Sequence, residues 1–220
     1  MSIRAVAFDV DGTLYPNAAM YLRSLPFALR RIRLILAFAA VRREIRTRRP
    51  IDDLPATEAA MLAERLRITP EKARKRIDRE IYGSWERVLD RVAPYPHVEE
   101  CIQSLKQSGL EVAATSDFPV ERKLKRLGLD HLFECRLWTE ESGYLKPHPE
   151  SFLMIADCLG VPPGEMLYVG NSYEYDMIGA KRAGMMAAHR VRRPVPGTIA
   201  DYSFSDYRDL CRWVDKIRLA

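Results

Sequence analysis

The sequence predicts a doubly wound α/β fold whose parallel sheet is covered by helices on both faces and interrupted near its start by an all-helical insert. Beyond residue 93, short apolar runs alternate with amphipathic segments of helical period, a pattern typical of strands joined by crossover helices. Before that point, residues 16–93 show helical spacing throughout. We therefore expect a core built from residues 1–15 and 94–220, with the helical insert between its two parts.

The composition favours a folded protein whose basic charge is local. The 220 residues are 47% apolar and 30% charged, an ordinary globular balance. Residues 23–49 contain nine arginines and one acid, a local sum of +8 within a formal net charge of +5, which leaves −3 for the rest of the chain. A basic balance confined to one segment describes the surface of that segment, and it gives no specific indication of nucleic-acid binding.

The cysteines and the first residues bear on the compartment. Four cysteines lie more than twenty residues apart, so no pair has the spacing of a zinc or redox motif, and we expect scattered buried thiols (Cys101, Cys135, Cys158 and Cys211). Two acids interrupt the first apolar run, so we expect no signal peptide and a cytoplasmic protein.

In the insert, residues 26–45 carry an apolar stripe at helical spacing, which predicts one helix with arginines beside the stripe. Its members are Phe27, Leu34, Phe38, Val41 and Ile45. A second helix is expected near residues 57–67. A third should begin with Thr69 as N-cap and Pro70 at the first helical position.

The core shows the alternation most clearly. The first strand is expected near residues 3–8, and further strands near 110–115, 135–138, 166–169 and 185–189. Helices should fill the intervals at 97–107, 119–127, 150–159 and 173–183, each followed by a glycine that favours a helix end. A closing amphipathic helix places Leu210, Trp213, Val214 and Ile217 on one side.

Polar residues follow each predicted strand, where an open parallel sheet binds its ligands. They are Asp9 and Asp11 after the first strand, Thr115, Ser116 and Asp117 after the second, Lys146 after the third, and Asn171 and Asp176 after the fourth. All of them suit a phosphate or a hard metal ion. Asp9 and Asp11 are two residues apart, so in extended chain both carboxylates can face one site.

These motifs resemble, in order, those of the haloacid dehalogenase superfamily of phosphatases. Residues 9–13 read Asp-Val-Asp-Gly-Thr and resemble the first motif, and the strand end at 115–116 resembles the second. Residues 143–147, which contain Lys146, resemble the third motif, and residues 168–172 together with Asp176 resemble the acidic fourth. The resemblance implies a Rossmann-like core, and the position of the insert resembles that of the family's helical cap.

The resemblance implies a magnesium-dependent phosphohydrolase acting on a phosphomonoester. Asp9 would be the nucleophile and Asp11 the general acid and base, while Ser116 would donate to the phosphoryl group and Lys146 would balance its charge. Gly12, Thr13 and Thr115 are further candidates for substrate binding, and Mg²⁺ would be held by Asp9, Asp11, Asp176 and Asn171. Spacing alone does not decide between Thr115 and Ser116 for the second motif. The Ser-Asp-Phe sequence favours Ser116, although Asp117 replaces the family's common Asn.

Several alternatives stay open. A phosphomutase shares these motifs, and a catalytically idle protein could use the basic insert to bind an acidic partner; dehalogenation is disfavoured because Asp11 is present. The expected substrate is a small phosphorylated metabolite, and the protein is expected to be a monomer or a homodimer. For the arginine-flanked helix we favour burial with arginines at its ends over a dimer interface, an anionic substrate cleft or contact with a membrane surface. The charge of the insert nevertheless predicts a contribution to binding an anionic substrate or surface.

Overall fold

The computed structural model describes residues 3–219 except 91 and 194. In this part of the chain, six parallel strands form one sheet in the order β3-β2-β1-β4-β5-β6, which confirms the doubly wound α/β prediction. The strands are β1 (Ala5–Asp9), β2 (Glu111–Ser116), β3 (Cys135–Trp138), β4 (Met166–Gly170), β5 (Met186–Arg190) and β6 (Tyr202–Phe204). The edge strand β6 was not predicted, because a segment of three residues is too short to show a period.

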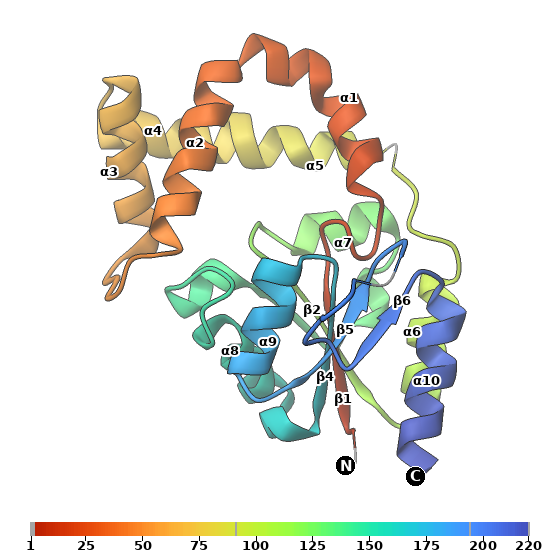
Figure 1. Cartoon of the computed structure of the whole chain (residues 1–220). Coiled ribbons are helices and arrows are strands. Elements are labelled where there is room, and N and C mark those ends of the chain that lie inside the picture. The colour runs from red at the N-terminus through yellow and green to blue at the C-terminus, as the bar shows by residue number, and fades with distance from the viewer. Residues whose placement is uncertain (1–2, 91, 194, 220) are drawn as a thin grey trace.

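Helices cover both faces of the sheet, as Figure 1 shows. One face packs against α6 (Val98–Gln107), α7 (Glu121–Leu127) and α10 (Tyr207–Leu219), and the other against α8 (Glu150–Leu159) and α9 (Ile178–Arg182). Alternate residues of β1 enter the two cores, with Val6 and Phe8 in the first and Ala5 and Ala7 in the second. The central strand is therefore buried on both sides, which explains its continuous apolar run.

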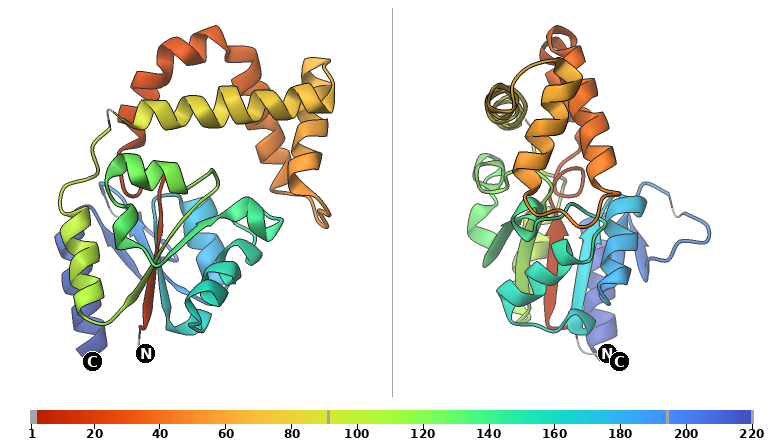
Figure 2. Two further views of the ribbon diagram at one scale, coloured as in Figure 1. Left: turned by 180° about the vertical axis from the view of Figure 1, so that it is seen from behind. Right: turned by 90° about the vertical axis from the view of Figure 1, so that its left-hand side faces the viewer.

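The insert forms an arch over the carboxyl ends of the strands, while the start of β1 and the end of α10 lie at the opposite side of the molecule (Figures 1 and 2). Its helices are α1 (Asn17–Arg30), α2 (Ile32–Ile45), α3 (Leu54–Leu66), α4 (Pro70–Arg76) and α5 (Gly83–Leu89), with a π-helical segment, Ile77–Tyr82, joining the last two. A separate apolar cluster centred on α2, α3 and α4 holds the arch together. We keep residues 16–93 as the proposed cap and the remainder as the proposed core.

The predicted single helix over residues 26–45 is wrong, because the chain breaks at Arg31 between α1 and α2. The stripe from Leu34 to Ile45 packs into the cap as expected, whereas Phe27 is only half-buried and does not join that cluster. Phe27 and the residues from Leu34 onward share the same helical spacing in the sequence, but they belong to two helices and pack against different neighbours. The third helix begins as predicted, with the Thr69 hydroxyl accepting a hydrogen bond from the Lys72 amide.

The expectation of four scattered thiols is also wrong. Cys101 and Cys211 form a disulfide between α6 and α10, and Cys135 and Cys158 form a second one between β3 and α8. Sequence separations of 110 and 23 residues carry no recognisable spacing, so only the packing of the elements reveals these pairs. Over the described residues, none of the helices has the length and apolar character needed to cross a membrane. The cytoplasmic location stays a prediction.

Candidate active site

Asp9 ends the central strand, and two contacts fix its buried carboxylate. Its Oδ1 atom accepts a hydrogen bond from Lys146 Nζ at 2.6 Å, and its Oδ2 atom accepts one from the Thr13 hydroxyl at 2.8 Å. The side chain is 6% exposed. Both carboxylate oxygens are thus oriented by side chains from the predicted motifs, Thr13 from the first and Lys146 from the third.

Lys146 lies between two carboxylates, because Nζ is also 2.7 Å from Asp176 Oδ1. Burial raises the pKa of Asp9 to about 7 against the opposing charge of Lys146, and the negative charges of Asp176 and Asp11 add to the rise. Burial alone would lower the pKa of Lys146, but Asp176 and Asp9 outweigh it and hold that pKa well above its usual range. Lys146 is therefore a permanent cation beside the proposed nucleophile.

Asp11 has a different set of partners from Asp9. Its Oδ2 atom accepts hydrogen bonds from Ser116 Oγ and from Lys123 Nζ, both at 2.5 Å, and its Oδ1 atom accepts one from the Tyr15 hydroxyl. Burial raises the pKa of Asp11, but the charge of Lys123 and the hydrogen bonds from Lys123, Ser116 and Tyr15 outweigh burial and lower it overall. Without substrate, Asp11 is therefore an anion.

Lys123 is a site residue that sequence reasoning missed. It lies within α7, with its side chain buried, and Nζ is 3.1 Å from Ser116 Oγ as well as bonded to Asp11. The one signal for it is its position, seven residues after Ser116 in the helix that follows the strand end. In a helix rich in basic residues, the sequence gives no reason to expect that this lysine is buried while the others are solvated.

The strand end at residues 115–116 favours Ser116 as the second-motif residue. Its hydroxyl contacts Asp11 and Lys123, whereas the buried Thr115 hydroxyl has no hydrogen-bond partner. The other two substrate-binding candidates shape the turn after β1. Gly12 has φ +89°, and a Cβ there would lie 2.4 Å from Asn17 Nδ2, so this position requires glycine. Thr13 uses its hydroxyl to hold Asp9.

The oxygens near Asp9 fit a magnesium ion. The side-chain oxygen of Asn171 accepts from the Thr13 hydroxyl at 3.1 Å and also faces the Asp11 carbonyl oxygen at 3.0 Å and Asp9 Oδ2 at 3.3 Å. In the last two contacts an amide oxygen faces two other oxygens, none of which can donate a hydrogen bond. Turning the amide over lets its nitrogen donate to the Asp11 carbonyl and to Asp9 Oδ2. With its oxygen turned toward a cation, the Asn171 amide would join the Asp9 carboxylate and the Asp11 carbonyl as a third hard ligand.

Asp176 supports this cluster from behind. Its Oδ2 atom accepts the backbone N–H groups of Asn171 at 3.1 Å and Ser172 at 2.9 Å, and its Oδ1 atom meets Lys146. Within the described ranges, no three His, Cys, Asp or Glu side chains are grouped so that they could hold a metal. The proposed ligands Asp9, the Asp11 carbonyl and Asn171 include only one such side chain, that of Asp9. Direct coordination of the metal by Asp176 stays a prediction.

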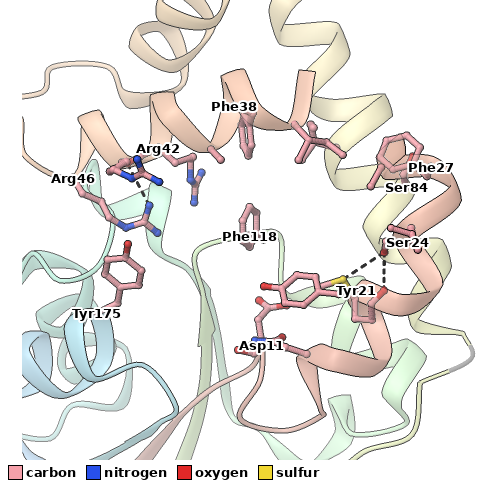
Figure 3. A pocket seen from close by; sticks show the side chains of 18 residues that line it. Asp11, Tyr21, Ser24, Phe27, Phe38, Arg42, Arg46, Ser84, Phe118 and Tyr175 are labelled. Atoms are coloured by element: carbon pink, nitrogen blue, oxygen red, sulfur yellow. Dashed lines mark hydrogen bonds between the residues drawn. The ribbon is translucent and has the colours of Figure 1, made fainter. Parts of the chain in front are cut away.

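Two arginines of the basic insert connect the cap to the core above this site (Figure 3). Arg46, the residue that caps the C-terminus of α2, forms an ion pair with the Asp117 carboxylate and donates to the Lys146 carbonyl at 2.8 Å. Arg42 donates to the Asp117 carbonyl and forms buried ion pairs with Glu58 and Glu140. Asp117, whose charge the sequence left unexplained, therefore binds a cap arginine, and these two arginines are not solvated surface charges.

The buried Glu140 predicts a pH dependence of stability. Burial raises its pKa from 4.5 to about 7, with Arg42 opposing and Glu58 adding to the rise. Between those values the folded state binds a proton that the unfolded state has released, so the free energy of unfolding should fall as pH rises from 5 to 7.5. In Glu140→Gln this fall should be smaller by up to about 3 kcal/mol. Urea unfolding of both proteins across that range measures it, and parallel curves would contradict the assignment.

The fold and the site together define an enzyme class with paired aspartates at the carboxyl edge of a doubly wound sheet and a helical insert above them. A family model described as haloacid dehalogenase-like hydrolase matches residues 3–184, and the chain belongs to this family. The confirmed family accounts for the order of the four motifs along the chain.

Several relatives with which the chain aligns over most of its length are named as phosphatases. The chain is 32% identical over 206 residues to glyceraldehyde 3-phosphate phosphatase of Methanopyrus kandleri, covering 87% of this chain and 84% of the relative. It is 27% identical to phosphoglycolate phosphatase of Mannheimia succiniciproducens, covering 96% and 98%, and 29% identical to that of Escherichia coli, covering 94% and 86%. These relatives confirm the expectation of an enzyme of the phosphatase type in this superfamily.

Solved structures support the fold alone. A HAD phosphatase from Thermococcus onnurineus aligns with a TM-score of 0.64 at 24% identity, covering 96% of this chain and 98% of that one. The L-2-haloacid dehalogenase RSc1362 aligns with a TM-score of 0.70 at 20% identity, covering 98% and 100%. Because a phosphatase and a dehalogenase fit about equally well, the fold does not decide between these two chemistries.

Proposed function

We propose that the chain is a magnesium-dependent phosphohydrolase that cleaves a phosphomonoester through a phosphoryl-aspartate intermediate on Asp9. The observation that carries this proposal is the meeting of Asp9, Asp11, Ser116 and Lys146 at the carboxyl ends of neighbouring strands. The phosphatase names of the relatives support it, and they suggest small phosphorylated substrates.

In this mechanism Asp9 attacks phosphorus, and the bond from phosphorus to the leaving oxygen breaks as Asp11 delivers a proton to that oxygen. Water then attacks the phosphorus of the intermediate while Asp11 takes one of its protons, and the bond between phosphorus and the Asp9 oxygen breaks. Asp9 is thereby restored as a carboxylate, and Asp11 gives its proton up when phosphate leaves. Bound magnesium would neutralise charge on the phosphoryl oxygens, and Asp9, the Asp11 carbonyl and Asn171 would hold it. Lys146 opposes the rise in the pKa of Asp9 and places a positive charge beside its carboxylate.

Asp11 needs a proton before it can act as an acid, although its partners favour the anion in the free enzyme. A phosphoryl group that accepts the hydrogen bonds of Lys123 and Ser116 would withdraw them from Asp11 and bring negative charge beside it. Both effects raise the pKa of Asp11. Substrate binding would thus prepare the acid, with Lys123 and Ser116 passing from the aspartate to the phosphate.

The test of this assignment is Asp11→Asn. The variant keeps the backbone carbonyl, so its magnesium dependence should persist, while turnover of an alkyl phosphate should fall by roughly 10²-fold or more. Phosphate release is measured at several magnesium concentrations, with Asp157→Asn on the exposed side of α8 as the matched control. Unchanged turnover in Asp11→Asn would assign the acid to another residue.

The two alternatives differ in their products. A phosphomutase returns the phosphoryl group to a substrate hydroxyl, so isomer forms without release of inorganic phosphate. An idle binding protein releases none and forms no isomer. Magnesium-dependent release of inorganic phosphate from a generic aryl phosphate separates the proposed hydrolase from both.

A further inference from the structure

A cavity of about 590 Å³ lies between the arch of cap helices and the core, with Asp11 in its wall. Most of its lining is apolar, including Met20, Leu25 and Phe27 from α1, Ile35 and Phe38 from α2, and Phe118 from the core. Figure 3 shows Phe38 and Phe118 pointing toward one another across this space. Its volume is that of pockets that enclose ligands of some hundreds of daltons, far above the needs of a two-carbon or three-carbon phosphate.

The position of Asp11 indicates which part of a substrate would occupy the cavity. Attack by Asp9 is in line, so the leaving oxygen lies on the far side of phosphorus, where Asp11 protonates it. Because Asp11 forms part of the cavity wall, a group attached to that oxygen would extend into the cavity. The cavity is therefore the site of the leaving alcohol.

We propose that the alcohol of the preferred substrate carries a sizeable apolar group, so that the enzyme acts on amphiphilic phosphomonoesters; this inference rests on the proposed phosphohydrolase function. An apolar wall gains free energy from burying hydrocarbon, about 0.8 kcal/mol or roughly fourfold in affinity for each methylene. A short polar alcohol gains none of this, although Asn17, Ser24 and Ser84 also line the cavity and offer it hydrogen bonds. Arg42 and Arg46, at one end of the cavity, already form ion pairs with core carboxylates.

The outer surface of the same helices suggests where such a substrate could come from. Leu22, Leu29 and Leu36 are 73%, 66% and 62% exposed, and residues 17–43 contain six arginines and no acid. An apolar surface flanked by arginines suits the boundary of a lipid bilayer. The amphiphile could therefore be free in solution or part of a membrane, and both sources share the same chemistry.

The decisive measurement is kcat/KM for ethyl, butyl, hexyl and octyl phosphate, all below the concentrations at which they form micelles. We expect a rise of up to about fourfold per methylene until the cavity is filled. A second arm presents a long-chain alkyl phosphate in phosphatidylcholine vesicles, and activity there would identify a bilayer as a source. Activity confined to the free monomers would identify solution as the source.

The experiment distinguishes failure of the inference about the alcohol from failure of the proposed phosphohydrolase function. If ethyl phosphate and short polar phosphates are hydrolysed as well as hexyl and octyl phosphate, and the vesicle arm is inactive, the inference is overturned while the phosphohydrolase function stands. If no phosphate is released from any ester, including a generic aryl phosphate, the proposed function itself fails.

Matched variants locate the effect on the cavity. Leu25 lines it and Leu29 does not, although both are exposed leucines of α1. In Leu25→Asn the ratio of octyl to ethyl phosphate in kcat/KM should fall about tenfold, since burying a leucine side chain is worth about 1.5–3 kcal/mol. In Leu29→Asn the ratio for the free monomers should stay at the wild-type value. Ala28→Phe, which fills part of the cavity, should move the preferred chain length downward. Equal ratios in all four proteins would place the alcohol elsewhere.

Discussion

Asp9→Asn should abolish turnover, with a loss of roughly 10⁴-fold or more, the scale on which removal of a nucleophile acts. The substitution keeps the shape of the side chain, and the Asn oxygen can still accept from Lys146 or Thr13. It removes the anionic oxygen that attacks phosphorus, and the amide has no comparable nucleophile. Phosphate release from an aryl phosphate with magnesium measures the loss.

Trapping the intermediate identifies the nucleophile directly. With an aryl phosphate whose leaving group departs without a proton, Asp11→Asn should still become phosphorylated and then hydrolyse slowly, because Asp11 is needed to activate water. Rapid quench and peptide mapping should therefore find the label on Asp9 in the wild type and in Asp11→Asn. Asp9→Asn should carry none. A label on another residue, or turnover without any label, would refute the proposed mechanism.

Much of the sheet and the motif positions could be predicted because local patterns carry them. Each buried strand is an apolar run ended by a polar residue, and parallel strands bring those ends to one edge. Asp9, Ser116 and Lys146 are each recognisable from such an end, or from the segment that follows it. The structure brings them together as the sheet order requires.

Contacts between distant elements could not be predicted. Lys123 reaches Asp11 across 112 residues, and Arg46 reaches Asp117 across 71, with nothing in the local sequence to mark either lysine or arginine as buried. A run of charged residues in the sequence predicts a solvated surface, and only the packing of the elements shows which of these side chains are buried. The two disulfides have the same origin, since they depend on how α6 meets α10 and how β3 meets α8.

The fourth motif gives the second large effect, because Asp176 holds together several parts of the site. It accepts two backbone N–H groups of the loop that carries Asn171, and it forms an ion pair with the buried Lys146. In Asp176→Ala the loop loses both acceptor contacts and the lysine loses one of its two counter-charges. We expect magnesium-dependent turnover to be abolished, and Asp176→Asn, which keeps an acceptor oxygen, to distinguish loss of charge from loss of loop geometry.

Asn171 should respond in the opposite direction. Its side-chain amide faces the Asp11 carbonyl and Asp9, so Asn171→Asp would add a negative charge where the proposed ion lies. At about 4 Å and an effective dielectric near 20, the added attraction has a magnitude of roughly 4 kcal/mol before desolvation and repulsion from phosphate reduce it. We expect the variant to keep its activity and to reach half-maximal turnover at a lower magnesium concentration than the wild type. Gln103→Glu, which adds the same charge on the exposed surface of α6, should leave that concentration unchanged. Weaker magnesium binding in Asn171→Asp, or full turnover of Asp176→Ala at low magnesium, would move the metal away from these oxygens.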